Sequence, residues 1–460
     1  MRADLAVCGG RVVSDGTVAE ATLLVTAERV SAWLDPAIPV EAERVVDAKD
    51  TYVLPGAVDP HVHFAAFSPM ADDFESASVC AAYGGVTTIM PFVGPREGMS
   101  VGEALDIFIE EGRRRSVVDF ALHCRLRPDP KVIDQVPEAV ERGVPSVKFF
   151  LAYRKRGLMF SDDLALRVLE VTAGCGGLAL VHAENGWVID HLEDRLAAGG
   201  RTAPIDYLAS RPHATESEAV ARAITLAELA GCPLYVVHLS TREGLEEVRR
   251  ARARGVAVFA ETCPQYLFLT DAEMARQKGL AKVAPPLRWD RDRDALWRGL
   301  REGWVQTIGS DHAPFTVADK AVGERDIFAA SFGMPGLETM VPLVLGGPGE
   351  RGGLDLAELV RRLSENAARI FGLYPAKGTL RVGADADFVL WEPGAETIIR
   401  ARDLHSRAGY TCFEGWPVRG RIRAVYQRGR VLVEDGALRA DPGSGRFLAR
   451  RPGRPECGAA

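Results

Sequence analysis

Residues 56–63 read Gly-Ala-Val-Asp-Pro-His-Val-His, and this stretch decides the fold. Its apolar first half is typical of a β-strand that is buried on both faces. Successive side chains of a strand point to opposite faces, so His61 and His63, two residues apart, point to the same face. We therefore expect a buried strand over 56–64 whose last residues direct two imidazoles to one side.

Seven further short apolar runs follow the first one, at 87–92, 119–126, 146–152, 178–184, 234–240, 256–264 and 306–314. Segments with helical periodicity separate them, including 161–172, 217–229, 241–254 and 292–301. Strands that alternate with helices are typical of parallel βα units. Eight such units predict an α/β fold, a closed (β/α)8 TIM-like barrel over residues 56–374. An open doubly wound sheet is the alternative, but no Gly-x-Gly-x-x-Gly motif follows any of the runs.

Both ends of the chain have a different pattern: short strand-like segments with alternating apolar and polar residues occur before residue 55 and after residue 388. We expect residues 1–55 and 375–445 to form one small β-sandwich domain built from both termini. Residues 446–460, rich in Arg, Pro and Gly, are expected to be a C-terminal tail that is disordered or lies across a subunit contact.

The composition excludes several classes of protein. A formal charge of -7 gives no reason to expect a nucleic acid or an anionic membrane as partner. No apolar run approaches the roughly 20 residues needed to span a bilayer, and the N-terminus lacks the apolar core of a signal peptide. The 8 cysteines are scattered, without a Cys-x-x-Cys pair. A cytoplasmic enzyme is therefore expected.

Ionisable residues recur where the predicted strands end, which in a barrel is the face that carries active sites. His182, His238 and Asp311 stand at the ends of the fifth, sixth and eighth strands, and Lys148 lies inside the apolar fourth strand. With His61 and His63 they predict a site for two divalent metal ions, most simply Zn2+. Two such ions need bridging anionic oxygens, which a carbamate formed from Lys148 and carbon dioxide would provide.

Each of these residues has a structural alternative. A single strand histidine usually packs or hydrogen-bonds within the core, and Lys148 alone would suit a buried carboxylate partner. The conjunction of these residue types at strand ends favours the metal site. His123 and His405 lack that placement and are interpreted as structural, and His213 as a surface loop residue.

Several motifs together resemble the amidohydrolase superfamily, and within it the dihydropyrimidinase/D-hydantoinase family of cyclic amidohydrolases. The segments that carry this resemblance occur in the family order and cover nearly the whole chain: 56–63, 72–76, 84–88, 147–153, 181–186, 235–240, 261–266, 285–288, 309–315 and 377–380.

The resemblance implies hydrolysis of a cyclic amide C–N bond, opening a hydantoin- or dihydropyrimidine-like ring by means of a hydroxide that bridges two metal ions. It also implies a homo-oligomer, a tetramer or a dimer. Asp311 would exchange protons with the hydroxide and the leaving nitrogen, and Tyr153 would stabilise the oxyanion. The resemblance further implies that His61, His63 and Asp311 bind one metal ion, that His182 and His238 bind the other, and that carbamylated Lys148 bridges them. Main-chain groups near Ala284 and Phe332 would contact the substrate.

The chain departs from the family pattern around the substrate. The loop 64–71 is shorter and more apolar than expected of a hydantoinase, and Ala284 and Phe332 stand where many relatives have serine and asparagine. Ala65 stands where dihydroorotases usually have a carboxylate-binding arginine, which counts against an acidic ring such as dihydroorotate but does not exclude allantoin. An allantoinase or another cyclic-imide hydrolase therefore stays open as an alternative, and a non-catalytic scaffold related to dihydropyrimidinase is the alternative of a different class.

Overall fold

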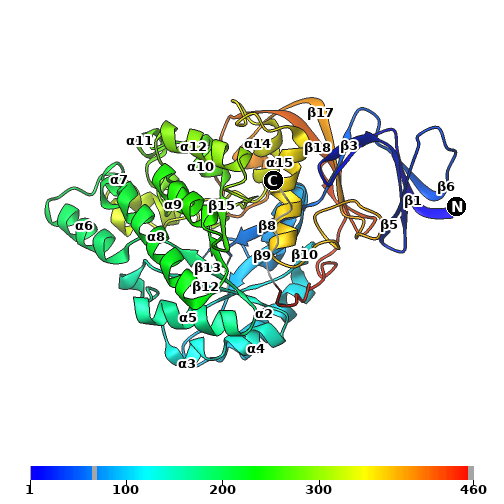
Figure 1. The fold of residues 1–460 in the computed structure, drawn as a ribbon. Coiled ribbons are helices and arrows are strands. Elements are labelled where there is room, and N and C mark those ends of the chain that lie inside the picture. The colour runs from blue at the N-terminus through cyan, green and yellow to red at the C-terminus, as the bar shows by residue number, and fades with distance from the viewer. Residues whose placement is uncertain (1, 65–69, 454–460) are drawn as a thin grey trace.

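The computed structural model describes residues 2–64 and 70–453. Eight parallel strand positions form the barrel predicted from the sequence, and they occur in chain order around it (Figure 1). The strands are β8 (Ala57–Val62), β9 (Val86–Val93), β10 (Asp119–Phe120), β11 (His123–Arg125), β12 (Ser146–Phe150), β13 (Leu178–His182), β14 (Leu234–Val236), β15 (Val258–Thr262) and β16 (Thr307–Ile308).

The third strand is split, because β10 and β11 both pair with β9. The eighth strand is short, and the ring closes beyond it, where the His63 amide donates to the His312 carbonyl at 2.7 Å. Almost every residue of these strands is buried. Closure therefore directs the carboxyl ends of all eight strands to one face, as a TIM-like barrel requires.

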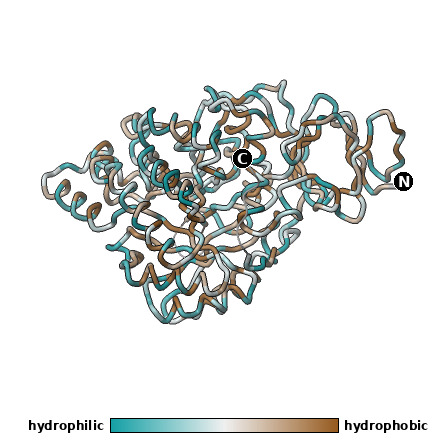
Figure 2. Tube along the Cα trace, in the orientation of Figure 1, coloured by the Kyte–Doolittle hydropathy of each residue, from teal (hydrophilic) through white to brown (hydrophobic). Residues whose placement is uncertain are grey.

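Helices cover the outside of the barrel (Figure 1), and Figure 2 shows hydrophilic colour along many of them. In the helix that begins after Thr241, the buried Gly244, Leu245, Val248 and Ala251 recur at helical spacing, and the Thr241 hydroxyl caps the Gly244 amide. The helices are α1 (Phe74–Tyr83), α2 (Val101–Arg115), α3 (Pro130–Ile133), α4 (Val136–Glu141), α5 (Asp162–Gly174), α6 (Gly186–Ala198), α7 (Asp206–Ser210), α8 (His213–Ala230), α9 (Arg242–Ala253), α10 (Pro264–Phe268), α11 (Ala272–Gln277), α12 (Asp290–Arg301), α13 (Val317–Ala321), α14 (Met340–Gly346), α15 (Leu356–Val360) and α16 (Asn366–Ile370).

One histidine assignment is wrong. His213 is not a surface loop residue but the first residue of α8, which begins four residues before the predicted helix. Its Nε2 atom lies 2.9 Å from a carboxylate oxygen of the buried Asp292 at the start of α12. The sequence around it, with Pro212 before it, looks like a loop because the helix begins directly after the proline.

Two antiparallel-rich sheets stand beside the barrel and contain strands from both ends of the chain (Figure 1). In the larger sheet β7 pairs with β17, which joins the N-terminal and C-terminal segments. Buried side chains of both sheets, among them Leu23, Phe388 and Tyr426, share one core. The larger sheet has the order β20-β19-β18-β17-β7-β2-β3 and the smaller one β5-β4-β1-β6.

Their bounds are β1 (Arg2–Cys8), β2 (Arg11–Ser14), β3 (Thr17–Glu20), β4 (Thr22–Thr26), β5 (Arg29–Leu34), β6 (Glu41–Asp47), β7 (Tyr52–Pro55), β17 (Phe388–Ile398), β18 (Pro417–Gln427), β19 (Arg430–Glu434) and β20 (Ala437–Leu438).

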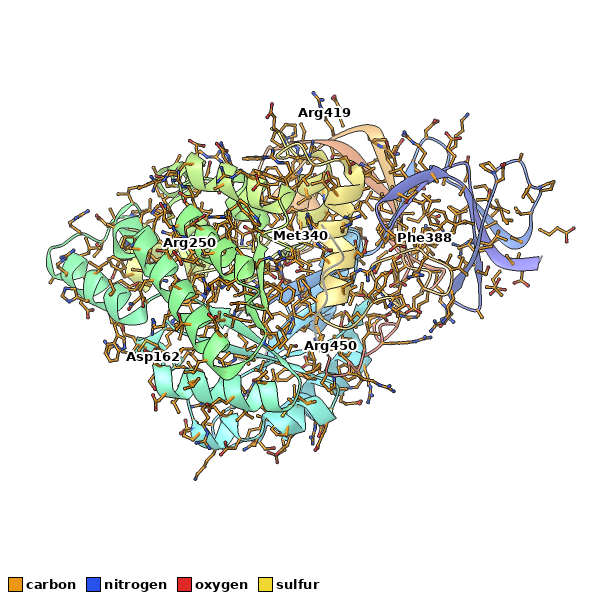
Figure 3. All side chains as sticks on the ribbon, viewed as in Figure 1. Asp162, Arg250, Met340, Phe388, Arg419 and Arg450 are labelled. Atoms are coloured by element: carbon orange, nitrogen blue, oxygen red, sulfur yellow. The ribbon has the colours of Figure 1, made fainter. Side chains whose placement is uncertain are left out.

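Residues 446–453 of the C-terminal tail pack against the barrel, contrary to the expectation of disorder. The amide of Leu448 donates to the Phe120 carbonyl at 2.7 Å. The guanidinium of Arg450 is buried at the amino ends of the strands, where it donates to the Ser146 hydroxyl at 2.8 Å and to the Leu122 carbonyl (Figure 3). This part of the tail therefore seals the barrel at the end opposite the predicted site.

No helix in the described ranges is long and apolar enough to cross a membrane. The seven cysteines among the described residues are free thiols.

A buried charge cluster joins the barrel to the adjoining sheet. The ammonium of Lys377 lies 2.6 Å from a carboxylate oxygen of Asp119 on β10 and 2.7 Å from one of Asp387, next to β17. Asp385 adds a third carboxylate at 3.0 Å, and Lys377 is only 1% exposed. The carboxylates raise the pKa of Lys377 against the effect of burial, so Lys377 keeps its positive charge in the folded protein.

We expect Lys377→Met to lower the free energy of unfolding by about 3–5 kcal/mol, because it leaves the buried Asp387 carboxylate without its cation and Asp119 with only Arg428. Urea denaturation followed by circular dichroism measures this. The control is Lys155→Met, which removes an exposed ion pair with Asp194 and should cost about 0–1 kcal/mol. An equal loss in the two variants would contradict the role of Lys377.

Candidate metal centre and substrate cavity

A cavity of about 380 Å³ opens at the carboxyl ends of the barrel strands. Eight of the nine residues predicted for the site line it: His63, Lys148, Tyr153, His182, His238, Ala284, Asp311 and Phe332. The ninth, His61, is fully buried and lies directly behind His63 and Asp311. Barrel closure therefore brings together side chains that are up to 271 positions apart, from Phe332 back to His61.

One group of ligand atoms converges at the carboxyl end of β8. The Nε2 atom of His61 lies 3.1 Å from Nε2 of His63 and 3.1 Å from a carboxylate oxygen of Asp311. On the other side of its ring, Nδ1 of His61 lies 2.6 Å from Glu261. In the neutral imidazole Nδ1 therefore carries the proton and donates to Glu261, and the bare lone pair of Nε2 points at the other ligand atoms.

A second group has the same design. The Nδ1 atom of His182 lies 2.9 Å from Nε2 of His238, while Nε2 of His182 lies 2.8 Å from a Glu184 oxygen. In the neutral imidazole Nε2 of His182 therefore carries the proton and donates to the Glu184 carboxylate, which leaves the Nδ1 lone pair facing His238. The ring centroids of His61 and His238 are 5.3 Å apart, so the two groups are adjacent.

These donor sets fit divalent cations. Two lone pairs that face each other at about 3 Å repel unless a proton or a cation lies between them. Burial holds the pKa of both His182 and His238 well below the usual value, so both rings are neutral. When the proton of His238 is on Nδ1, which has no hydrogen-bond partner among the described residues, its Nε2 lone pair faces His182 and a cation fits between the two rings. Around His61, burial opposes the charge, but Glu261 and Asp311 raise the pKa of the imidazole to about 9. A metal ion bound there would take the place of that proton.

Lys148 lies on the floor of the cavity and is 1% exposed. Its ammonium nitrogen is 5.0 Å from the ring centroid of Phe92 and 5.5 Å from that of Phe150. Burial lowers the pKa of Lys148 to about 7, although Glu261 and Asp311 act in the opposite direction. No described residue forms an ion pair with it, so the alternative of a directly paired lysine gains no support.

Three site residues have a left-handed backbone, which is uncommon outside glycine. They are Tyr153 with φ 68°, His238 with φ 40° and Asp311 with φ 47°. Each follows a barrel strand or its extension, where the chain must turn sharply toward the next helix. Strained backbone of this kind is concentrated at functional sites, and here it directs three side chains into one cavity.

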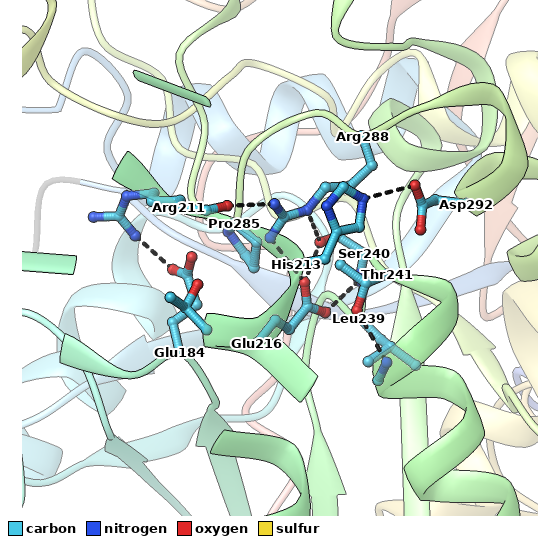
Figure 4. Close-up of polar contacts among 12 residues, drawn as sticks. Glu184, Arg211, His213, Glu216, Leu239, Ser240, Thr241, Pro285, Arg288 and Asp292 are labelled. Carbon is cyan, nitrogen blue, oxygen red and sulfur yellow. Dashed lines mark hydrogen bonds and ion pairs between the residues drawn. The ribbon is translucent and has the colours of Figure 1, made fainter. Parts of the chain in front are cut away.

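Buried residues behind the ligands extend the site, and sequence analysis did not single them out. Glu184 accepts from Arg211 at 2.6 Å, and Arg288 donates to the Arg211 carbonyl at 2.6 Å. Figure 4 shows how Arg288 also reaches Glu216 and the Ser240 hydroxyl, and how Glu216 accepts from the Ser240 amide. The network connects the His182 ligand to the starts of α8 and α9.

Two further lysines hold the loop that contains Phe332. The ammonium of Lys282 donates to the carbonyls of Ile327 and Ala330 at 2.6 Å each, and that of Lys320 donates to the Gly333 carbonyl at 2.8 Å. The ring of Phe332 stacks on Tyr153, with centroids 5.0 Å apart. The two buried lysines thereby fix the position of Phe332 against Tyr153.

The main-chain groups predicted to contact substrate are available. Within the described ranges, neither the amide nor the carbonyl of Ala284 or Phe332 forms a main-chain hydrogen bond. Tyr153 presents its hydroxyl to the same space, 3.3 Å from Nδ1 of His182. Burial keeps the pKa of that hydroxyl well above its usual value, so it stays a hydrogen-bond donor.

The two histidines interpreted as structural lie outside the cavity. His123 is buried between the Ser146 hydroxyl at 2.7 Å and the Pro60 carbonyl at 3.0 Å. His405 pairs with Glu338 and stacks on Tyr83 with centroids 3.5 Å apart. Of the atypical loop 64–71, residues 65–69, Ala65 included, lie outside the described part of the chain.

Comparisons with known proteins agree with this fold. The Amidohydrolase family model matches residues 52–432. A D-hydantoinase of Ralstonia pickettii is 40% identical over 419 residues, 89% of this chain and 91% of its own length. An L-hydantoinase of Paenarthrobacter aurescens is 36% identical over 97% of this chain and 98% of its own.

Solved structures give the same result. A crystal structure of a dihydropyrimidinase from Brevibacillus agri NCHU1002 superposes with a TM-score of 0.93 at 34% identity, covering 97% of this chain and 99% of that one. A structure of D-hydantoinase gives a TM-score of 0.92 at 37% identity, with the same coverage.

The fold and these relatives thus define a barrel hydrolase, with candidate histidine and carboxylate ligands grouped at its strand ends. The chain belongs to the amidohydrolase family, and its relatives include hydantoinases and a dihydropyrimidinase.

We expect Glu261→Gln to weaken zinc binding by about 10–100-fold, because the ligand His61 loses a charged hydrogen-bond partner. Competition with a chromogenic chelator measures the affinity. Glu247→Gln, which changes an exposed carboxylate paired with Arg250 on α9, is the control. Equal zinc affinity in the two variants would show that Glu261 does not orient His61.

Proposed function

We propose that the protein hydrolyses an amide C–N bond in a small cyclic amide, opening a hydantoin- or dihydropyrimidine-like ring. The observation that carries this proposal is the pair of adjacent histidine groups at the barrel cavity, in which ring nitrogens of two histidines lie 3.1 Å apart in one group and 2.9 Å apart in the other. The relatives named D-hydantoinase, L-hydantoinase and dihydropyrimidinase support the ring as substrate. The cavity volume of about 380 Å³ suits a small molecule.

Two divalent metal ions, proposed to be Zn2+, would be held by this chain. His61, His63 and Asp311 would bind one ion, and His182 and His238 the other, in keeping with their lone-pair directions. When bound, such ions supply Lewis acidity toward the amide carbonyl and lower the pKa of the attacking water.

Lys148 would become a bridge between the two ion sites by carbamylation. The neutral amine attacks the carbon of carbon dioxide, the C–N bond forms, and the amine gives up one proton to the solvent. A lysine with a pKa near 7 has a large neutral fraction at neutral pH, which this step requires. One C=O π bond of carbon dioxide breaks, and the resulting carbamate carries one negative charge shared by two oxygens in place of an unpaired amine on the cavity floor.

The remaining roles fall to side chains that already face the cavity. The carboxylate of Asp311 would take the proton of the attacking water and pass it to the leaving nitrogen of the ring. The hydroxyl of Tyr153 would donate to the oxygen that becomes negative as the carbonyl is attacked. Main-chain groups of Ala284 and Phe332 would bind the amide edge of the ring.

The same geometry would serve an allantoinase or another cyclic-imide hydrolase. An assay that compares several rings is therefore needed to identify the substrate. A non-catalytic scaffold has less support, because all six ligand positions are occupied by residues able to bind metal. We also propose that the protein acts in the cytoplasm as a homo-oligomer, a tetramer or a dimer.

The first experiment measures ring opening by purified protein supplied with zinc and bicarbonate. The substrates are hydantoin, 5-phenylhydantoin, dihydrouracil, allantoin and dihydroorotate. We expect turnover of a hydantoin or of dihydrouracil, at rates that fall to background after chelation and return with zinc. Turnover of allantoin alone would identify an allantoinase instead of a hydantoinase. Failure to open any of the five rings with two metals bound would refute the proposal.

We expect Lys148→Ala to lose at least one metal ion per chain and to lower kcat by several orders of magnitude, because the bridging oxygens disappear. Metal content by plasma mass spectrometry and turnover are measured on the same sample. Lys155→Ala, an exposed lysine seven positions further on, is the control. A Lys148 variant with two metals and normal turnover would exclude the carbamate.

A further inference from the structure

Two arginines line the cavity above the candidate metal centre: Arg125, the last residue of β11, and Arg156, the last residue of the 3-10 helix η1 (Arg154–Arg156). We propose that they select a cyclic amide whose exocyclic substituent ends in a carboxylate. This inference rests on the proposed function and names the substrate class of the same site.

Charge in the cavity favours an anion. Apart from the candidate ligands and Tyr153, the ionisable side chains among its described lining residues are these two arginines, and both are positive. Asp311 is the only carboxylate among those lining residues, and it is committed to the metal centre. The chain as a whole has a net charge of -7, so a positive cavity wall runs against the average charge of the molecule.

Arg156 differs from the two basic residues beside it in the same turn. Arg154 pairs with Asp190 at 2.9 Å and Lys155 pairs with Asp194 at 2.5 Å. Arg156 has no acidic partner among the described residues, and it alone of the three lines the cavity. Its guanidinium carbon lies 4.1 Å from the ring centroid of Phe332, so stacking on an aromatic face holds the cation at the cavity wall.

Arg125 enters the cavity from β11, the strand next to β12, which carries Lys148. It is in register with Lys148 across the β11–β12 pair, and residues opposite each other in a parallel pair point to the same face of the sheet. The side chain of Arg125 therefore leaves its strand toward the barrel mouth, as that of Lys148 does. A guanidinium keeps its charge when buried and offers five donors in a planar fork, which matches a carboxylate.

Apolar side chains also line the cavity, among them Phe64, Phe92, Phe150, Leu158 and Phe315. A substituent with an apolar stem and a terminal carboxylate would match both the apolar side chains and the arginines. A purely aromatic substituent would pack against the phenylalanines and give the guanidinium of Arg156 no anion.

The test compares two substrates of the same shape, 5-(2-carboxyethyl)hydantoin and its primary amide, with the zinc-loaded protein. We expect kcat/KM to favour the acid by about 10–100-fold, the range of a hydrogen bond to a charged group. Arg125→Gln and Arg156→Gln should each reduce this acid-to-amide ratio by about tenfold. The ratio is taken within each variant, so a general loss of activity cancels.

Arg154→Gln is the matched control, because Arg154 belongs to the same turn but pairs with Asp190 outside the cavity; its ratio should equal that of the parent protein. Equal turnover of acid and amide by the parent, or a ratio that both cavity variants leave unchanged, would overturn this inference while the proposed function stands. Failure to open these rings and unsubstituted hydantoin, dihydrouracil and allantoin would instead refute the proposed function itself.

Discussion

The hydrogen bonds from His61 to Glu261 and from His182 to Glu184 are the constraint on which the site depends. Each carboxylate fixes which ring nitrogen carries the proton, and so which nitrogen presents a lone pair to the cavity. Without this constraint the neighbouring imidazoles could hydrogen-bond to each other and form a stable polar core with no affinity for metal. The barrel adds the second requirement, since only a closed ring of strands brings β8 and β15 within reach of one another.

Burying so many charges is costly, and the arrangement limits that cost. Glu184 and Glu216 are each paired with an arginine, Arg211 and Arg288, which are themselves buried. Replacing buried ion pairs by apolar residues is often neutral or stabilising, so stability alone does not account for this network. The position of the network behind His182 accounts for it better. The ion pair with Arg211 fixes the Glu184 carboxylate in the orientation that holds Nε2 of His182 and leaves Nδ1 facing His238.

The sequence predicts those parts of the molecule that follow from local pattern. Buried parallel strands are apolar throughout, so the eight strand positions could be located from the chain alone, and the residues predicted as ligands at their ends line or adjoin one cavity. Glu261 could not be assigned, because its partner His61 is 200 positions away and only barrel closure joins them. Arg125 and Arg156 were missed for a related reason: an arginine at a strand end or in a turn looks like a solvated surface residue until the cavity is seen. Composition likewise misled for residues 446–453, whose backbone hydrogen-bonds to the barrel despite their Arg, Pro and Gly content.

Overall similarity does not determine which hand of a chiral ring such a cavity would accept, because a D-hydantoinase at 40% identity and an L-hydantoinase at 36% are both close relatives. The local geometry carries that information. Under the proposed function, Tyr153 holds one carbonyl of the ring, and main-chain groups of Ala284 and Phe332 hold its amide edge. A ring fixed at two edges has its substituent carbon in one place, and the configuration there decides which wall the substituent meets. Arg125 and Arg156 come from adjacent strand ends, so the positive wall lies on one side of the barrel. The two arginines would therefore select the hand of an anionic substrate together with its charge.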